Sequence, residues 1–363
     1  MLVVHQEEGM LGVDMKMQEY QFRNKITRFS FALMIFVVSI HTYNVDIYGL
    51  YENTDHLGLM VRGLENYIRF FERACVPFFF MISGYLFFRN YSPDKLFPKY
   101  KSRIKTVLIP YLIWCTIYYI YFVCLTRIPW LQNLINGEKA DLSLGGWINS
   151  LWREQYYTLW FLKELIILIL LTPVIHFALT QQRRKKVFKY AGVLFLFLVY
   201  LEKSKMISVS YNPFDFHYLV GAFIGINYRE LPLARDKRIT QLAWVTMPLL
   251  MIYGGWCVSQ NIEWGLMTIL IFCICIWLEF NIFSYEKKPK WWMKPTFFYY
   301  CMHDLILEAL EKIFLIVFGR GSMFALIDYL CMPFVTIAIC VAAACILKKY
   351  IPHVWSVLTG DRG

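Results

Sequence analysis

A histidine lies near the end of the first apolar run of this chain. The run begins after Arg28, and at about 1.5 Å per helical residue His41 would lie roughly 20 Å further along the helix axis. One broad helix face would carry, at spacings of three and four, Ser30, Met34, Val37, Val38 and His41, and Asn44 continues that face. An imidazole titrates near neutral pH, so His41 could take a proton from a hydroxyl and return one to a leaving group. A histidine that only bridges helices through hydrogen bonds is the alternative.

Three charged side chains form a second candidate group. Arg69, Glu72 and Arg73 are three or four residues apart, so a helix would place them on one face. They could pair with one another at the surface or bind an anionic acceptor. Pro77 follows them and is expected to bend the helix.

Long apolar runs must position these residues. The runs cover residues 29–48, 67–88, 106–126, 157–179, 187–201, 211–228, 241–258, 264–283, 297–318 and 323–347. A hydrocarbon core of about 30 Å requires about 20 apolar residues per helix. Lys and Arg cluster in every second loop between the runs, and the loops between those carry few of them. Cytoplasmic loops of membrane proteins carry an excess of Lys and Arg. The pattern predicts an all-α, polytopic membrane bundle of about ten transmembrane helices, with both termini in the cytoplasm.

Composition supports the lipid environment and argues against other classes. Hydrophobic residues make up 58% of the chain and charged residues 17%, which a soluble core of this size could not bury. The formal net charge of +11 falls in clusters beside the apolar runs, where anionic headgroups explain it better than nucleic acid does. The ten cysteines lie in or beside apolar runs without metal-type spacing, so neither a metal site nor a disulfide framework is expected.

The domain organisation follows from the same pattern. We expect a disordered cytoplasmic leader at residues 1–22, a transmembrane domain at 23–350 and a cytoplasmic tail at 351–363. Four acidic residues in the leader argue against a signal peptide. The protein is therefore expected to be a multi-pass component of the cytoplasmic membrane.

Several sequence runs, taken in order, resemble one known family. They are His41 in the first apolar run, VPFFFMISGYL at 76–86, KSRIKTVLIPY at 101–111, TLWFLK at 158–163 and FYYCMH at 298–303. Together they resemble the membrane acyltransferase-3 family over nearly the whole chain. The membrane region of vancomycin-resistance serine racemases is similar to the same family.

The resemblance implies a reaction. It implies O-acylation, usually O-acetylation, of an extracytoplasmic glycan or another envelope molecule by cytoplasmic acyl-coenzyme A, with His41 as the catalytic base. The chain departs from the family at one point. The family usually carries an arginine with ten residues between it and the histidine, but Ser30 occupies that position and Arg28 lies two residues earlier.

The predicted topology suggests which residues contact the acyl donor and which contact the acceptor. The phosphates of coenzyme A should contact cytoplasmic cations, for which Arg28, Lys101, Arg103 and Lys105 are the candidates, and His303 is a further candidate donor contact. The positive-inside bias explains the same cations without a ligand. On the outer side, the acceptor candidates are Arg69, Glu72, Arg73 and Trp160, although packing is the alternative for Trp160.

Two other functions remain open from the sequence. One is a transporter of a small polar solute such as serine, although corresponding broken helices in two halves of the chain, which often mark such a site, are not evident. The other is a noncatalytic partner in polysaccharide export.

Overall fold

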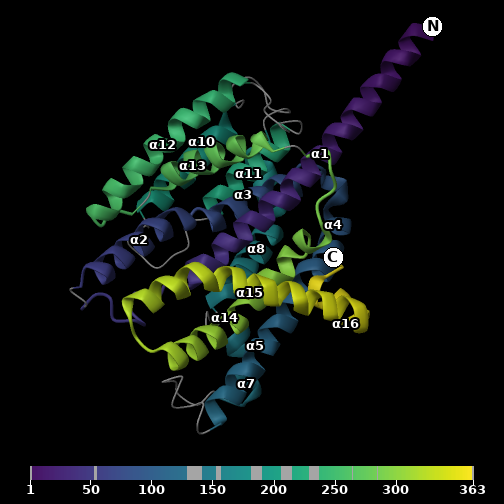
Figure 1. The fold of residues 1–363 in the computed structure, drawn as a ribbon. Coiled ribbons are helices and arrows are strands. Elements are labelled where there is room, and N and C mark those ends of the chain that lie inside the picture. Colours follow the sequence, from purple (N-terminus) through teal and green to yellow (C-terminus); the bar gives the residue numbers. More distant parts are fainter. Residues whose placement is uncertain are drawn as a thin grey trace.

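The computed structural model describes residues 2–52, 55–128, 141–152, 157–180, 190–205, 215–228, 237–263, 265–283 and 285–361. Every regular element in these ranges is helical, so the predicted all-α class is confirmed. The long helices pack side by side as a bundle, and the N-terminal part of α1 projects beyond it (Figure 1).

The α-helices have the following bounds: α1 Leu2–His41, α2 His56–Glu72, α3 Cys75–Phe88, α4 Leu96–Arg103, α5 Ile109–Arg127, α7 Leu144–Trp152, α8 Trp160–Leu170, α9 Thr172–Leu179, α10 Ala191–Lys205, α11 Asp215–Asn227, α12 Lys237–Ser259, α13 Leu266–Glu279, α14 Thr296–Phe318, α15 Ser322–Tyr350 and α16 Pro352–Thr359. Shorter helical turns are η1 Pro93–Lys95, η2 Ile104–Leu108, η3 Tyr157–Leu159, η6 Phe280–Ile282 and η7 Trp291–Met293.

The described helices include membrane-spanning candidates. By length and composition, four helical segments of the described chain could cross a bilayer, or five if the bent pair α8–α9 forms one span. The four are His56–Phe88, which joins α2 and α3, Pro93–Arg127, which ends with α5, Gln241–Ser259 and Ser322–Tyr350. The larger number of spans and the cytoplasmic position of both termini remain predictions. The domain limits at 22 and 350 also remain predictions. The structure adds that α1 runs through the first limit and that α16 follows the second.

Proline explains where two helices depart from the expected runs. The run at 67–88 is not one helix, because α2 ends at Glu72 and α3 begins at Cys75. The ring of Pro77 clashes with the carbonyl four residues earlier, that of Arg73, which places the break there. In the run at 106–126, Pro110 follows the π-helical turn η2 instead of bending the helix sharply.

Two further helix ends differ from the sequence expectation. The first apolar run extends to residue 48, but α1 ends at His41 and the chain turns over residues 45–52. The run at 157–179 is divided into α8 and α9, which are bent by 66° at a break that precedes Pro173. The break between α2 and α3 and the break between α8 and α9 both lie in the N-terminal half of the chain. They are therefore not the pair of corresponding breaks, one in each half, that would favour a transporter.

Two helices of the core approach each other at backbone distance. A Cβ atom added at Gly221 of α11 would lie 2.0 Å from the carbonyl oxygen of Met81 in α3, and one at Gly84 would lie 2.2 Å from that of Tyr218. Such contact requires residues without side chains, as is common between membrane helices. The glycines therefore fix α3 against α11, and α3 in turn forms one wall of the site described below.

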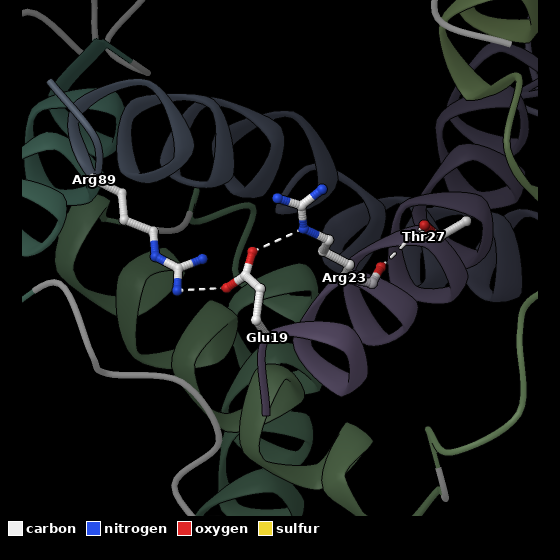
Figure 2. Close-up of polar contacts among 4 residues, drawn as sticks. All are labelled: Glu19, Arg23, Thr27 and Arg89. Carbon is white, nitrogen blue, oxygen red and sulfur yellow. Dashed lines mark hydrogen bonds and ion pairs between the residues drawn. The ribbon is translucent and has the colours of Figure 1, made fainter. Parts of the chain in front are cut away.

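An ion pair holds α1 against the end of α3 at the side from which α1 enters the bundle. Glu19 accepts hydrogen bonds from Arg23 at 2.8 Å and from Arg89 at 2.7 Å (Figure 2). Partial burial would raise the pKa of Glu19, but the hydrogen bonds and charges of Arg23 and Arg89 lower it below its ordinary value. The pairing favours the charged form of Glu19 and fixes the register of α1 relative to α3.

Candidate active site

A narrow cavity runs along α1 and reaches the histidine identified in the sequence. It has a volume of about 210 Å³ and lies between α1, α3, α8 and α14. Its α1 wall extends from Ile26 to His41, a rise of about 22 Å at 1.5 Å per residue. That distance is roughly two thirds of a 30 Å hydrocarbon core. The cavity therefore extends from the predicted cytoplasmic part of α1 to the depth of His41.

The cavity wall is mostly apolar. The polar side chains on it include Ser30, Ser83 and Thr158, and Trp160 at the start of α8 also lines it. Ser30 is the residue that replaces the usual arginine of the resembled family. Of the predicted site residues, His41 and Trp160 are thus brought to the same cavity.

His303 lies directly beside His41. Their ring centroids are 5.2 Å apart and the ring planes are tilted by 54°. His303 is fully buried in α14, whereas His41 is partly exposed and lines the cavity. The sequence predicts that His303 contacts the acyl donor, coenzyme A. In the structure His303 lies against His41 and is not among the residues that line the cavity.

A cluster of polar side chains joins η3, the turn before α8, to α14 beside the cavity. The hydroxyl of Tyr300 donates a hydrogen bond to the carbonyl of Thr158. The Thr158 hydroxyl lies 3.4 Å from that of Tyr118 and 3.5 Å from a carboxylate oxygen of Asp304. These contacts hold Trp160, two residues after Thr158, beside the cavity.

Asn44 fixes the segment that follows His41. Its side-chain amide donates to the carbonyl of Ala325 and to Asp328, both at 3.1 Å, and its backbone N–H donates to Glu65 at 3.2 Å. Asn44, Glu65 and Asp328 are fully or almost fully buried. The network ties the end of α1 to α2 and α15, so it positions His41 from two other helices.

The three charged residues at the end of α2 do not act as one ladder. The guanidinium of Arg69 stacks on the ring of Tyr43 at 3.9 Å, and Arg73 forms an exposed ion pair of 2.9 Å with Glu263. Glu72 is buried, with 2% of its surface exposed. Arg69 and Glu72 thus lie near the end of α1, whereas Arg73 points to another part of the surface.

The cations predicted to bind the acyl donor differ in what they contact. Arg28 donates to the carbonyl of Lys287 at 2.9 Å and does not line the cavity. Lys101 is exposed on α4, and the guanidinium of Arg103 lies over the ring of Phe87 at 5.4 Å.

Lys105 forms an ion pair of 2.5 Å with Asp361, which follows α16. Hydrogen bonds from Lys105 and Ser356 lower the pKa of Asp361. Because its charge is already paired, Lys105 is a weaker candidate for a phosphate contact than Lys101.

Sequence reasoning missed one buried cation. Lys25 is fully buried in α1, where its ammonium donates to the carbonyl of Trp277 and to the side chain of Asn281, both at 2.6 Å. It also lies 3.7 Å from the centre of the Trp277 ring. The ammonium therefore caps the C-terminal end of α13. In the sequence Lys25 looks like one more residue of the basic cluster before the first span, which gave no signal of burial.

The helical membrane fold, the apolar cavity and the histidine at its end are consistent with a membrane-embedded transferase. An acyltransferase domain model of the acyltransferase-3 type matches residues 31–346. This chain belongs to the acyltransferase-3 family, and it is a membrane acyltransferase. The resemblance found in the sequence is therefore confirmed.

One curated protein is similar to this chain. The chain is similar to succinoglycan biosynthesis protein ExoH of Rhizobium meliloti (strain 1021), with 25% identity over 330 residues and 80% of each chain covered. No solved structure matches the chain significantly.

Proposed function

We propose that this protein transfers an acyl group, with acetyl as the first candidate, from cytoplasmic acyl-coenzyme A to a hydroxyl of an extracytoplasmic glycan. The cavity that extends along α1 to His41 is the observation that carries the proposal. The similarity to a succinoglycan biosynthesis protein supports a glycan acceptor. The protein would act in the cytoplasmic membrane.

The shape of the cavity fits the donor arm better than the whole donor. Coenzyme A carries several phosphate charges, which are costly to bring into a hydrocarbon core. Its uncharged pantetheine arm is long and thin, as is the cavity. Cytoplasmic cations would bind the phosphates, with exposed Lys101 and nearby Arg103 as the first candidates and Arg28 as a third.

His41 would act as the general base. It takes the proton of the acceptor hydroxyl while the oxygen attacks the thioester carbonyl. The C–S bond then breaks, and His41 returns the same proton to the leaving thiolate. The proton balance closes within the site, so no metal or redox partner is required. A base in this position commonly contributes about 10² to 10⁴ in rate.

The acceptor would approach from the end at which α1 and α2 meet. Arg69 stacks on Tyr43, two residues beyond His41, and Glu72 lies on the same helix as Arg69. Trp160 lies on the cavity wall and offers an aromatic face to a sugar ring. Arg73 is assigned a lesser role because Glu263 already pairs with it.

A reconstituted transfer assay tests the proposal. The purified protein in liposomes is given acetyl-coenzyme A labelled in the acetyl group and extracted envelope glycans, and both thiol release and labelled glycan are measured. We expect transfer by the wild type and a loss of about 10² to 10⁴ in kcat for His41→Ala.

Two results would contradict the proposal. One is transfer that is equally fast in His41→Ala. The other is labelled serine uptake that does not depend on His41 in a preparation that transfers no acetyl group, which would favour the transporter alternative.

A further inference from the structure

The hydrogen bonds of His303 define its tautomer. Its Nδ1 atom lies 2.7 Å from the carbonyl oxygen of Tyr300 and 3.2 Å from that of Tyr299. A carbonyl oxygen only accepts hydrogen bonds, so Nδ1 must carry the hydrogen. In a neutral ring, Nε2 then carries a lone pair and is an acceptor. The backbone of α14 therefore sets the chemical character of the opposite side of the His303 ring.

That acceptor atom is buried and lacks a bonding partner within the described part of the chain. His303 is fully buried, and no hydrogen bond to its Nε2 is formed by the described residues. A buried polar atom without a partner is costly, and such atoms often have a functional reason. The ring that lies beside it is that of His41, with 5.2 Å between the two centroids.

We propose that His303 is a positioning residue for His41, acting through its Nε2 atom. The proposal rests on the acyltransferase function proposed above. When substrates occupy the cavity, Nε2 of His303 accepts the N–H hydrogen bond of neutral His41. The other ring nitrogen of His41 then carries a lone pair and faces the cavity as the base. Catalytic hydrogen bonds are often long before substrates bind and shorten in the complex.

The hydrogen bond to His303 also stabilises the positive charge that His41 carries during the reaction. His41 becomes an imidazolium when it holds the proton of the acceptor hydroxyl, and the N–H that faces His303 then forms a charge-assisted bond to a neutral acceptor. The proton returns to the thiolate through the cavity-facing nitrogen. His303 remains neutral throughout, so no additional proton acceptor is needed. A buried carboxylate has the same orienting role beside the histidine of serine hydrolases.

Two isosteric substitutions separate this role from the alternatives. His303→Asn retains an N–H donor at the position of Nδ1, which preserves the bonds to the carbonyls, but it removes the acceptor at Nε2. His303→Gln places an amide oxygen near the position of Nε2 and loses the donor at Nδ1. We expect His303→Asn to lower kcat about 100-fold with KM for acetyl-coenzyme A unchanged, whereas His303→Gln retains a substantial part of kcat.

Other results would overturn the proposal. If His303 contacts the donor, His303→Asn raises KM for acetyl-coenzyme A and leaves kcat unchanged. If His303 only supports α14 through its carbonyl bonds, His303→Gln is the more damaging change, and its detergent-solubilised form unfolds at a lower temperature than His303→Asn. Failure of the proposed function is distinguishable from both, because the wild type itself would then show no His41-dependent transfer.

Discussion

At the scale of single residues, the environment of His41 decides what its imidazole can do. It lies at the end of an apolar cavity, its neighbour His303 is held by two backbone carbonyls, and Asn44 anchors the chain after it. Placing a base within about 0.5 Å of its productive position needs such support from neighbouring groups. The site is therefore preorganised by three helices besides α1.

Filling the cavity should slow the reaction although no catalytic group is removed. Ser30 lines the cavity near its predicted cytoplasmic end. We expect Ser30→Trp to lower kcat/KM for acetyl-coenzyme A by about 100-fold, because the donor arm can no longer take its position. The matched control is Phe36→Trp, since Phe36 lies on the same helix with 49% of its surface exposed. Equal activities of the two variants would show that the donor does not use this cavity.

The sequence alone indicates one of the two histidines, His41, as a candidate base. A histidine inside a long apolar run is conspicuous because burying it is costly, so His41 was identified from its position alone. The partnership with His303 was not predictable. Spacing along the chain relates residues of one helix, but it does not say which helices of a bundle become neighbours. The same limit applies to Asp328, whose bond to Asn44 has no trace in the sequence.

At the scale of elements, close packing of α3 on α11 determines one wall of the cavity. Ser83 lines the cavity, and the adjacent Gly84 approaches the carbonyl of Tyr218 in α11. Membrane helices gain stability from such close approach, because their apolar side chains are no better solvated by one another than by lipid.

Adding a methyl group at the tightest of these contacts should separate the helices. A Cβ at Gly221 would lie 2.0 Å from the carbonyl oxygen of Met81, which is backbone and cannot move aside cheaply. We expect Gly221→Ala to destabilise the protein by about 1 to 3 kcal/mol, measured by thermal unfolding in detergent.

Gly63 provides the control for this substitution. It lies within α2, and a Cβ there would meet nothing within 4 Å. Gly63→Ala should stabilise the protein by about 0.5 to 1 kcal/mol. A Gly221→Ala variant as stable as Gly63→Ala would contradict the packing of α3 on α11.

The ion pairs of Glu19 with Arg23 and Arg89 should make a pH-dependent contribution to the free energy of unfolding. The folded pKa of Glu19 is lowered, so its stabilisation is present above its ordinary value of 4.5 and is lost as the pH falls through the folded value. Glu19→Gln should cost about 0.2 to 1 kcal/mol near pH 7, because the pair is partly exposed and screened.

Thermal unfolding of wild type and Glu19→Gln at several pH values measures this effect. The two curves should converge at acidic pH. The exposed Glu52 provides a control, because its change to Gln should have no comparable effect. A difference between wild type and Glu19→Gln that grows as the pH falls would have the wrong sign for this account.

Helix identity was largely predictable, whereas helix ends were not. The long apolar runs of the sequence largely coincide with α5, α12, α14 and α15. The breaks at residues 73–74 and 171 each precede a proline, whose ring displaces the backbone carbonyl four residues earlier. Whether the helix breaks there also depends on how the neighbouring helices pack against it. Pro248 and Pro333 lie inside α12 and α15, so proline alone does not predict a break.

At the scale of the whole molecule, the proposed reaction requires two substrates to meet from opposite sides of a membrane. The charge pattern predicts that the basic loops and both termini are cytoplasmic. Figure 1 shows the N-terminal part of α1 and the end of α16 on the same side of the bundle. The side of the membrane on which they lie stays a prediction.

Reporter fusions test the predicted orientation. A fluorescent protein attached after residue 363 should fold and fluoresce, whereas a periplasmic phosphatase at the same position should be inactive. A control fusion after residue 52, in a loop predicted to lie outside, should give the opposite pattern. Phosphatase activity at the C-terminus would contradict the predicted topology and, with it, the side from which the donor enters.

The central claim is that an acyl group passes along α1 from a donor on one face to an acceptor on the other, with His41 as the base. The most direct test uses liposomes with the glycan sealed inside and labelled acetyl-coenzyme A added outside, where protein with its cytoplasmic face outward can bind the donor. The account predicts labelled glycan in the lumen and free thiol outside for the wild type, and neither for His41→Ala. Label that appears on the glycan only when both substrates are on the same face, or that appears equally in His41→Ala, would contradict it.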